Sequence, residues 1–116
     1  MGHLLPLKPA FFHPAARAAI QSFPSEVRRE VGKAIFDLQR GEVLGMPLSR
    51  MMPSLAAGAA ELRIRDRAGN YRVFYYTRSP KAILIFHAFV KKNQTTPKHE
   101  LDLAKKRLKE LLHEEI

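Results

Sequence analysis

The chain has no cysteine in its 116 residues, so it forms neither a disulfide nor a metal site with thiolate ligands. This composition suits a reducing compartment, and we expect a cytoplasmic protein. No apolar run approaches the roughly 18 residues that a membrane-spanning helix needs, and the N-terminus does not resemble a signal peptide. The length favours one domain over residues 1–116, and the hydrophobic content of 46% is ordinary for a globular fold.

Acidic residues are scarce beside basic ones, with 11 Asp and Glu against 20 Lys and Arg and a net charge of +9. The excess is concentrated in residues 61–109, which hold thirteen basic and four acidic side chains. Such a concentration is typical of a nucleic-acid-binding protein, and RNA is the first candidate. The alternative is that the basic residues only keep a small domain soluble.

The sequence also lacks the motifs of metal and nucleotide chemistry. Its histidines, at positions 3, 13, 87, 99 and 113, share no ligand spacing, and no acidic cluster accompanies them. Neither a phosphate-binding GxxxxGK[ST] loop nor a GxSxG nucleophile motif is present. We therefore expect any activity to need no metal and no cofactor.

Hydrophobic periodicity and turn residues predict a small α+β domain. Residues 42–60 are predicted to be a loop, and Gly69-Asn70 is predicted to be the turn between two strands. The predicted elements, in chain order, are an edge strand or extended arm at 4–12, helices at 13–22 and 24–41, strands at 60–66, 71–77 and 82–90, and a helix beginning at 96.

Basic side chains recur at alternate positions in the first predicted strand. Arg63, Arg65 and Arg67 therefore share one face of that strand. Arg72 in the next strand can converge with them, and Lys91–Lys92 ends the strand after that. Like charges on one face repel, so a polyanionic ligand is the expected reason for this pattern. Guanidinium groups bind phosphate bidentately and stay charged at physiological pH.

Candidates for acid–base catalysis are fewer. Cleaving RNA through its own 2′-hydroxyl requires a base, an acid and stabilisation of charge at phosphorus. His87, His99, Glu61 and the tyrosines are the available groups. His87 lies in an apolar strand, where a buried structural histidine is at least as well favoured as a functional one. His99 lies in the first turn of a helix, where it is either a neutral base or a solvated surface residue.

Four segments, in this order and spacing, resemble the RelE/ParE superfamily of toxins, and most closely its phage-derived HigB-like branch. They are Glu61-Leu62-Arg63, Tyr71-Arg72-Val73-Phe74-Tyr75, His87-Ala88-Phe89-Val90-Lys91-Lys92 and Thr96-Pro97-Lys98. Residues 24–31 and 45–48 also fit that branch, so the resemblance extends from about 22 to 112. It implies a RelE-like, microbial-RNase-type fold. In that fold two N-terminal helices pack on one face of a small, twisted antiparallel sheet, and a C-terminal helix follows.

The resemblance further implies the toxin of a type II toxin–antitoxin pair. Such a toxin is a ribosome-dependent endoribonuclease that cuts mRNA in the ribosomal A site without a metal, and a helix-turn-helix antitoxin neutralises it. Carried over by position, the implied catalytic residues are Arg72, Lys92 and His99, with Lys98 as the alternative to His99. The implied RNA-binding residues are Arg63, Arg65, Lys91 and Lys98.

Two other functions stay open. A ParE-like toxin shares the fold and poisons gyrase, but it generally needs no cluster of phosphate-binding residues. A non-catalytic nucleic-acid-binding or phage regulatory protein is the third possibility, because no residue is an obvious general acid or base.

Overall fold

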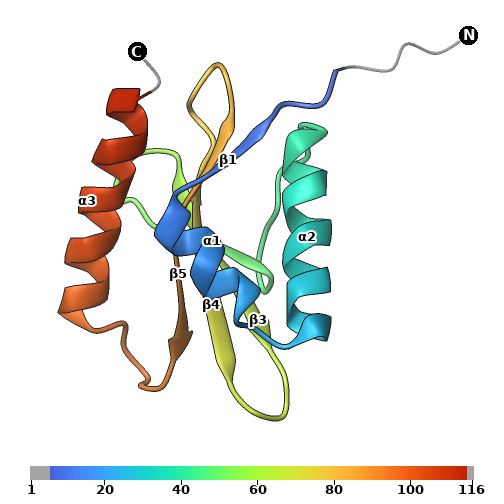
Figure 1. Cartoon of the computed structure of the whole chain (residues 1–116), viewed down its shortest axis with the longest axis vertical. Helices are drawn as coiled ribbons and strands as arrows, with labels where there is room; N and C mark the ends of the chain where they lie inside the picture. Colours follow the sequence, from blue (N-terminus) through green and yellow to red (C-terminus); the bar gives the residue numbers. More distant parts are fainter. Residues whose placement is uncertain (1–5, 115–116) are drawn as a thin grey trace, which may run out of the picture.

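In a computed structural model that describes residues 6–114, three helices flank one five-stranded mixed sheet (Figure 1). In chain order the elements are β1 (Ala10–Phe12), α1 (Pro14–Gln21), α2 (Ser25–Gln39), β2 (Ser49–Met51), β3 (Ala59–Arg65), β4 (Asn70–Tyr76), β5 (Ile83–Lys91) and α3 (Lys98–Glu114). The strands lie in the order β1-β5-β4-β3-β2. The predicted α+β class is confirmed, and the three long strands begin and end within one residue of their predicted bounds.

Each face of the sheet buries its own apolar cluster. On one face, the buried apolar residues of α2 pack with α1 against the sheet, in a cluster that includes Val27, Val31, Ile35, Leu38, Leu62, Val73 and Ile85. The other face packs against α3, through Phe74, Leu84, Phe86, Ala104, Leu108 and Leu111. Figure 1 shows α2 and α3 on opposite sides of the sheet, with α1 crossing in front. The N-terminal helices thus leave the second face to α3.

The structure adds one strand that the sequence did not predict. Ser49–Met51, inside the expected loop 42–60, forms β2 and pairs antiparallel with β3. Three residues between Pro47 and Pro53 are too short a run to show a period of two, so only pairing with β3 defines this strand. Its consequence is that Arg50 joins the sheet, directly opposite Glu61.

The predicted edge strand or arm at 4–12 forms a short strand in its last three residues, while residues 4 and 5 lie outside the described part of the chain. β1 pairs parallel with β5, with Phe11 opposite Leu84, whereas the other neighbouring strands are antiparallel. The sheet is therefore antiparallel from β2 to β5 and mixed as a whole. Within residues 6–114, no helix is long and apolar enough to cross a membrane.

Candidate nucleic-acid interface

The register of the three long strands brings the predicted basic residues together. Arg63 on β3 lies directly opposite Arg72 on β4, and Arg65 lies opposite Asn70. Asn70 is in turn opposite Lys91 on β5. Residues that pair directly across strands project from the same face. Four of the basic side chains proposed for RNA therefore share one face, which we call the basic face.

The basic face is the one that α3 partly covers. Arg72 lies opposite Phe89, and Phe89 belongs to the cluster that packs against Ala104 and Leu108 of α3. α3 thus covers the apolar part of this face. The basic side chains near the β3–β4 turn lie beside the part of the face that α3 covers.

A carboxylate side chain in the turn fixes this register. Asp66 Oδ1 accepts hydrogen bonds from the backbone N–H groups of Ala68, at 2.9 Å, and Gly69, at 3.0 Å. The predicted turn at Gly69-Asn70 is wrong in detail: the turn spans residues 66–69, and Asn70 already belongs to β4. Gly69 has no positive φ. The side-chain acceptor, rather than a left-handed residue, closes this hairpin.

At the centre of the basic face, Glu61 is buried between two guanidinium groups. Its Oε1 lies 3.8 Å from Arg63 Nε and its Oε2 lies 3.8 Å from Arg72 Nε. Glu61 is 4% exposed and Arg72 is 6% exposed. Among the described residues, Glu61 Oε2, Arg63 Nε and Arg72 Nε are buried without a hydrogen-bond partner. Buried polar atoms are nearly always hydrogen-bonded; these three are held only by the ion pairs between Glu61 and the two arginines.

Burial and three neighbouring charges act on the pKa of Arg72. Burial lowers the pKa of Arg72, the Glu61 carboxylate raises it, and Arg63 and Arg50 lower it. The guanidinium nevertheless remains charged at physiological pH. Its Nη1 donates to the carbonyl oxygen of Tyr71 at 3.2 Å, which fixes its orientation. A partly desolvated, oriented cation binds phosphate more strongly than a solvated one.

The basic face contains a cleft of about 240 Å³, lined by Pro47, Arg63, Arg65, Asn70 and Arg72. We call it the arginine cleft. The loop before β2 forms one wall, where Arg63 Nη1 lies 3.6 Å from the sulfur of Met46. The arginine cleft is lined by three of the predicted residues, Arg63, Arg65 and the largely buried Arg72.

A second cleft, of about 350 Å³, lies at the end of β5 and the start of α3. It is lined by Phe89, Val90, Lys91, Lys92, Asn93, Pro97, His99 and Glu100. We call it the β5–α3 cleft. Lys91 Nζ donates to the carbonyl oxygen of Gln94 at 2.8 Å, and the pKa of Lys91 is lowered first by burial and then by the charge of Arg72. Lys92 and His99, two of the predicted catalytic residues, lie here rather than in the arginine cleft.

Lys98 is the predicted site residue that lies outside both clefts. Its side chain is 87% exposed and forms an ion pair with Asp102 at 2.9 Å. It lines neither the arginine cleft nor the β5–α3 cleft. His99 beside it is also largely exposed, at 77%, with Nε2 3.5 Å from Glu100 Oε2. Both side chains extend from the first turn of α3 toward solvent.

His87 is a buried structural histidine, the first of its two possible roles. It is 1% exposed. Its Nε2 lies 2.7 Å from Glu100 Oε1, and its Nδ1 accepts from Arg107 Nη1 at 2.8 Å. Because Nδ1 accepts from Arg107, the ring is neutral and donates from Nε2 to Glu100, and burial lowers the pKa of His87 in the same sense. His87 thereby joins β5 to α3. His13 makes a similar contact, because its Nε2 lies 2.8 Å from Glu110 Oε1.

Sequence reasoning missed Arg50 and Asn93 and gave Glu61 too little weight. Arg50 lay in a predicted loop, and only β2 pairing places it beside Glu61. Asn93 lies in the connection between β5 and α3, where no periodicity marks a role. The position of Glu61 two residues before Arg63 in a strand was the available signal, because such residues share a face.

Acidic side chains do not gather into a metal site in the described part of the chain. No three His, Asp or Glu side chains of residues 6–114 lie close enough together to hold a metal ion. Glu61 faces Arg63 and Arg72, and Glu100 faces His87 and His99. The arginine cleft presents mainly cations, which suits an anionic ligand.

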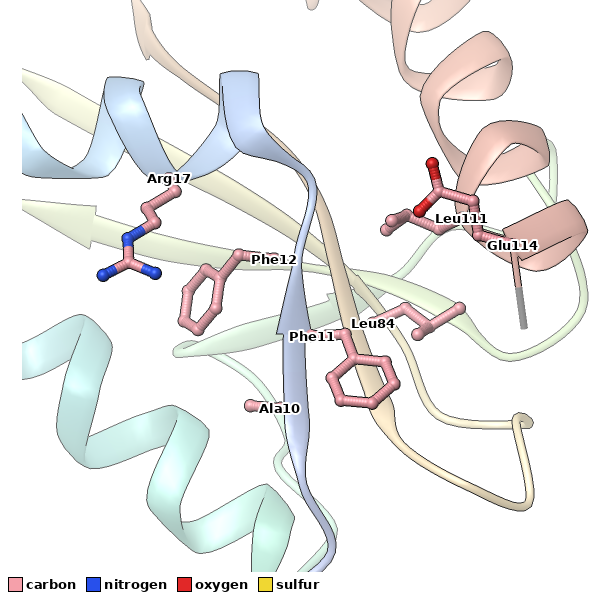
Figure 2. Close-up of a pocket in the computed structure, with 7 residues that line it drawn as sticks. All are labelled: Ala10, Phe11, Phe12, Arg17, Leu84, Leu111 and Glu114. Atoms are coloured by element: carbon pink, nitrogen blue, oxygen red, sulfur yellow. The ribbon is translucent and has the colours of Figure 1, made fainter.

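A further pocket, of about 400 Å³, lies at the other end of β5 (Figure 2). Phe11 of β1 and Leu84 of β5 line it near Leu111 and Glu114 of α3, with Arg17 of α1 on the other side of β1. Leu84 precedes Lys91 by seven positions, or about 23 Å along a strand. The pocket shares no residue with either cleft, and its lining is mostly apolar.

Comparison with known proteins identifies the family. A family model described as "Phage derived protein Gp49-like (DUF891)" matches residues 18–109. No curated protein matches the chain. The matched span contains α2, the strands β2 to β5 and every residue that lines the arginine cleft and the β5–α3 cleft. The chain therefore belongs to the phage-derived Gp49-like family, a RelE/ParE-like toxin family of toxin–antitoxin systems.

Proposed function

We propose that this chain is a HigB-like toxin that cleaves mRNA on the ribosome, as a metal-independent endoribonuclease. The observation that carries the proposal is the arginine cleft, which Arg63 and Arg65 of β3 and Arg72 of β4 line together. Guanidinium groups bind phosphate bidentately, so a phosphate group suits this cleft. Membership of a RelE/ParE-like toxin family supports the proposed role as a toxin.

The reaction proposed is transesterification at phosphorus. The 2′-oxygen of one nucleotide loses its proton and attacks the adjacent phosphorus, and the bond from phosphorus to the 5′-oxygen of the next nucleotide breaks. The departing oxygen takes a proton, which leaves a 2′,3′-cyclic phosphate and a free 5′-hydroxyl. Negative charge accumulates on the non-bridging oxygens in the transition state, where Arg72 and Lys92 would stabilise it.

His99 is the proposed proton-transfer group. Its imidazole lines the β5–α3 cleft and is open to solvent, so it can approach a bound strand. Glu61 is a positioning residue in this proposal, because its carboxylate faces the Nε atoms of Arg63 and Arg72 and is buried beneath them. It offsets the mutual repulsion of the two guanidinium groups.

The remaining cations are proposed to hold the RNA strand. Arg63 and Arg65 line the arginine cleft, and Lys91 lies at its border with the β5–α3 cleft. Lys98, exposed at the start of α3, would meet a phosphate farther along the strand. The ribosomal A site and a helix-turn-helix antitoxin are the proposed partners.

Non-catalytic RNA binding is the second candidate, and one observation favours it. His99 is 77% exposed, and its Nε2 lies 3.5 Å from Glu100 Oε2 rather than beside a group of the arginine cleft. An active nuclease would have to order His99 when substrate binds, because a general acid or base acts only within hydrogen-bond reach.

The test is primer extension on mRNA from translating ribosomes, with the protein treated with a chelator before it is added. Wild type should produce cuts in the A-site codon, and Arg72→Ala and Lys92→Ala should lose them while remaining folded. Arg28→Ala, on the exposed side of α2, is the matched control and should cut like wild type. An intact message with wild type contradicts the nuclease proposal. RNA binding without cuts would then favour a passive binder, and gyrase inhibition would favour a ParE-like toxin.

A further inference from the structure

We propose that Glu100 positions His99 for proton transfer, and that His87 and Arg107 hold Glu100 in the required orientation. The inference rests on the proposed function, because it assumes that His99 moves a proton of the bound RNA. It adds the carboxylate that orients the His99 ring and the buried contacts that fix this carboxylate.

The carboxylate of Glu100 is anchored from inside the molecule. His87, buried in β5, donates from Nε2 to Glu100 Oε1 over 2.7 Å. The Nδ1 atom of the same ring accepts from Arg107 Nη1 at 2.8 Å. Because both ring nitrogens are engaged, His87 presents its N–H to Glu100 in one fixed orientation. Glu100 is only 19% exposed, and its place in the first turn of α3 favours a negative charge.

The second oxygen of Glu100 faces His99. Glu100 Oε2 lies 3.5 Å from His99 Nε2, and both side chains line the β5–α3 cleft. Adjacent residues of a helix do not face each other, so helix geometry alone does not account for this approach. The bond from His87 accounts for it, since it holds one oxygen of the carboxylate and leaves the other on the side of His99.

The charge of Glu100 also needs an explanation. Among the described residues that line the β5–α3 cleft, Glu100 alone carries a carboxylate, and Lys91 and Lys92 line the same cleft. A negative charge opposes the binding of RNA phosphates here. A glutamine would accept the same hydrogen bond from His87 without this cost. Joining α3 to β5 therefore does not require the carboxylate, whereas stabilising a protonated histidine does.

The two nitrogens of His99 acquire different roles in this arrangement. Nε2 faces Glu100, which favours the proton on this nitrogen and leaves Nδ1 as the acceptor. Nδ1 takes the proton of the 2′-hydroxyl as that oxygen attacks phosphorus, and the departing 5′-oxygen takes a proton from water. The His99 ring then carries a positive charge, which the Glu100 carboxylate stabilises. Such contacts are often long without substrate and shorten when it binds.

The test measures cleavage of a labelled message on ribosomes, at saturating and at limiting ribosome concentrations. Glu100→Gln keeps an oxygen for the N–H of His87 and replaces the oxygen that faces His99 with an amide nitrogen. It should lower kcat by about 100-fold, at the lower end of what proton transfer contributes, and leave KM unchanged.

Glu110→Gln is the matched control, because it makes the same chemical change on the same helix. Glu110 Oε1 lies 2.8 Å from His13 Nε2, and neither residue lines the arginine cleft or the β5–α3 cleft. This variant should cleave like wild type. Urea unfolding of both glutamine variants should give midpoints close to that of wild type, which separates a loss of activity from a loss of folding.

A double variant tests whether Glu100 acts through His99. His99→Gln should lower kcat at least as much as Glu100→Gln does, and combining the two should cost nothing more. Losses that multiply would mean that Glu100 acts without His99. The ¹³C relaxation of the His99 ring provides a readout that does not depend on cleavage: the ring should be restricted in wild type and move freely in Glu100→Gln.

Cleavage by Glu100→Gln at the wild-type rate would overturn the positioning role and leave the nuclease function standing. An equally mobile His99 ring in wild type and in Glu100→Gln would also overturn it, whatever the cleavage rate. An intact message with wild type has a different meaning, because it overturns the nuclease function itself and the role of Glu100 in proton transfer with it.

Discussion

At the scale of single residues, the basic face depends on one carboxylate. Without Glu61, two guanidinium groups would lie opposite each other on β3 and β4 with nothing between them. Removing one partner of a buried charge group leaves the other uncompensated. Glu61 thus stabilises the two guanidinium groups. The alternating arginines of the strand do not predict this role, because their spacing shows which residues share a face and not how deeply each is buried.

His87 makes stability depend on pH. Burial holds the pKa of its imidazole below the ordinary value of 6.5; Glu100 acts in the opposite direction, and Arg107 and His13 also lower it. The unfolded chain therefore binds the proton more readily than the folded chain. The stability that neutral His87 contributes is present above about pH 6.5 and is lost as the pH falls below it.

Urea unfolding at about pH 7.5 and pH 5.5 checks this expectation. Below about pH 6.5, protonation of His87 should lower the unfolding free energy by up to about 1.4 kcal/mol for each pH unit. His87→Gln should flatten that slope, whereas His99→Gln, altered at an exposed ring, should keep it. Equal slopes in the wild type and in His87→Gln would show that other groups cause the acid sensitivity.

At the scale of elements, the β3–β4 hairpin sets the geometry of the arginine cleft, and its turn depends on Asp66. Asp66→Ala removes the acceptor for two backbone N–H groups and should cost about 1–2 kcal/mol of unfolding free energy. Asp66→Asn keeps a side-chain oxygen in place and should recover most of the loss. Urea denaturation measures both, and a loss of the same size in Asp66→Asn would mean that charge, rather than the hydrogen bonds, closes the turn.

The long elements could be predicted from the sequence because each has a strong local pattern. The α2 stripe repeats at three and four residues, and the strands β3 to β5 carry dense β-branched and aromatic residues. Strand β2 could not be predicted, since its three residues depend on hydrogen bonds to β3 and have no period of their own. Arg50 was missed for the same reason.

The residues of the candidate site differ in the same way, because only those in regular strands could be predicted from the sequence. Arg63, Arg65 and Arg72 belong to regular strands, so their shared face follows from spacing. The β5–α3 cleft forms where a strand ends and a helix begins, and its shape depends on residues 92–97 rather than on any period. A short motif did not predict which of two neighbouring side chains lines the cleft: His99 does and Lys98 does not.

At the scale of the whole molecule, the net charge of +9 should make RNA binding strongly dependent on salt. Each phosphate contact to a single strand contributes about 0.7 to the slope of log affinity against log salt concentration. Four cations on the basic face predict a slope with a magnitude of about three. Arg65→Ala should lower that magnitude by about 0.7 with little change in sequence preference.

Fluorescence anisotropy with a 2′-O-methyl RNA measures these slopes, because this RNA binds without being cleaved. Arg28→Ala on α2 removes one charge from outside the basic face and should leave the slope unchanged. If Arg28→Ala and Arg65→Ala reduce the slope equally, then binding follows the total charge, and the basic face has no special part in it.

The parallel pairing of β1 with β5 constrains the order in which the chain folds during synthesis. Ala10 lies opposite Ile83, so the first strand to leave the ribosome waits for one of the last before it can pair. Contacts this distant in sequence form late, because closing the long intervening loop is entropically costly. Strands β3 to β5 are contiguous hairpins and need no such wait. A newly made chain can therefore assemble its arginine cleft before its N-terminal strand is in place.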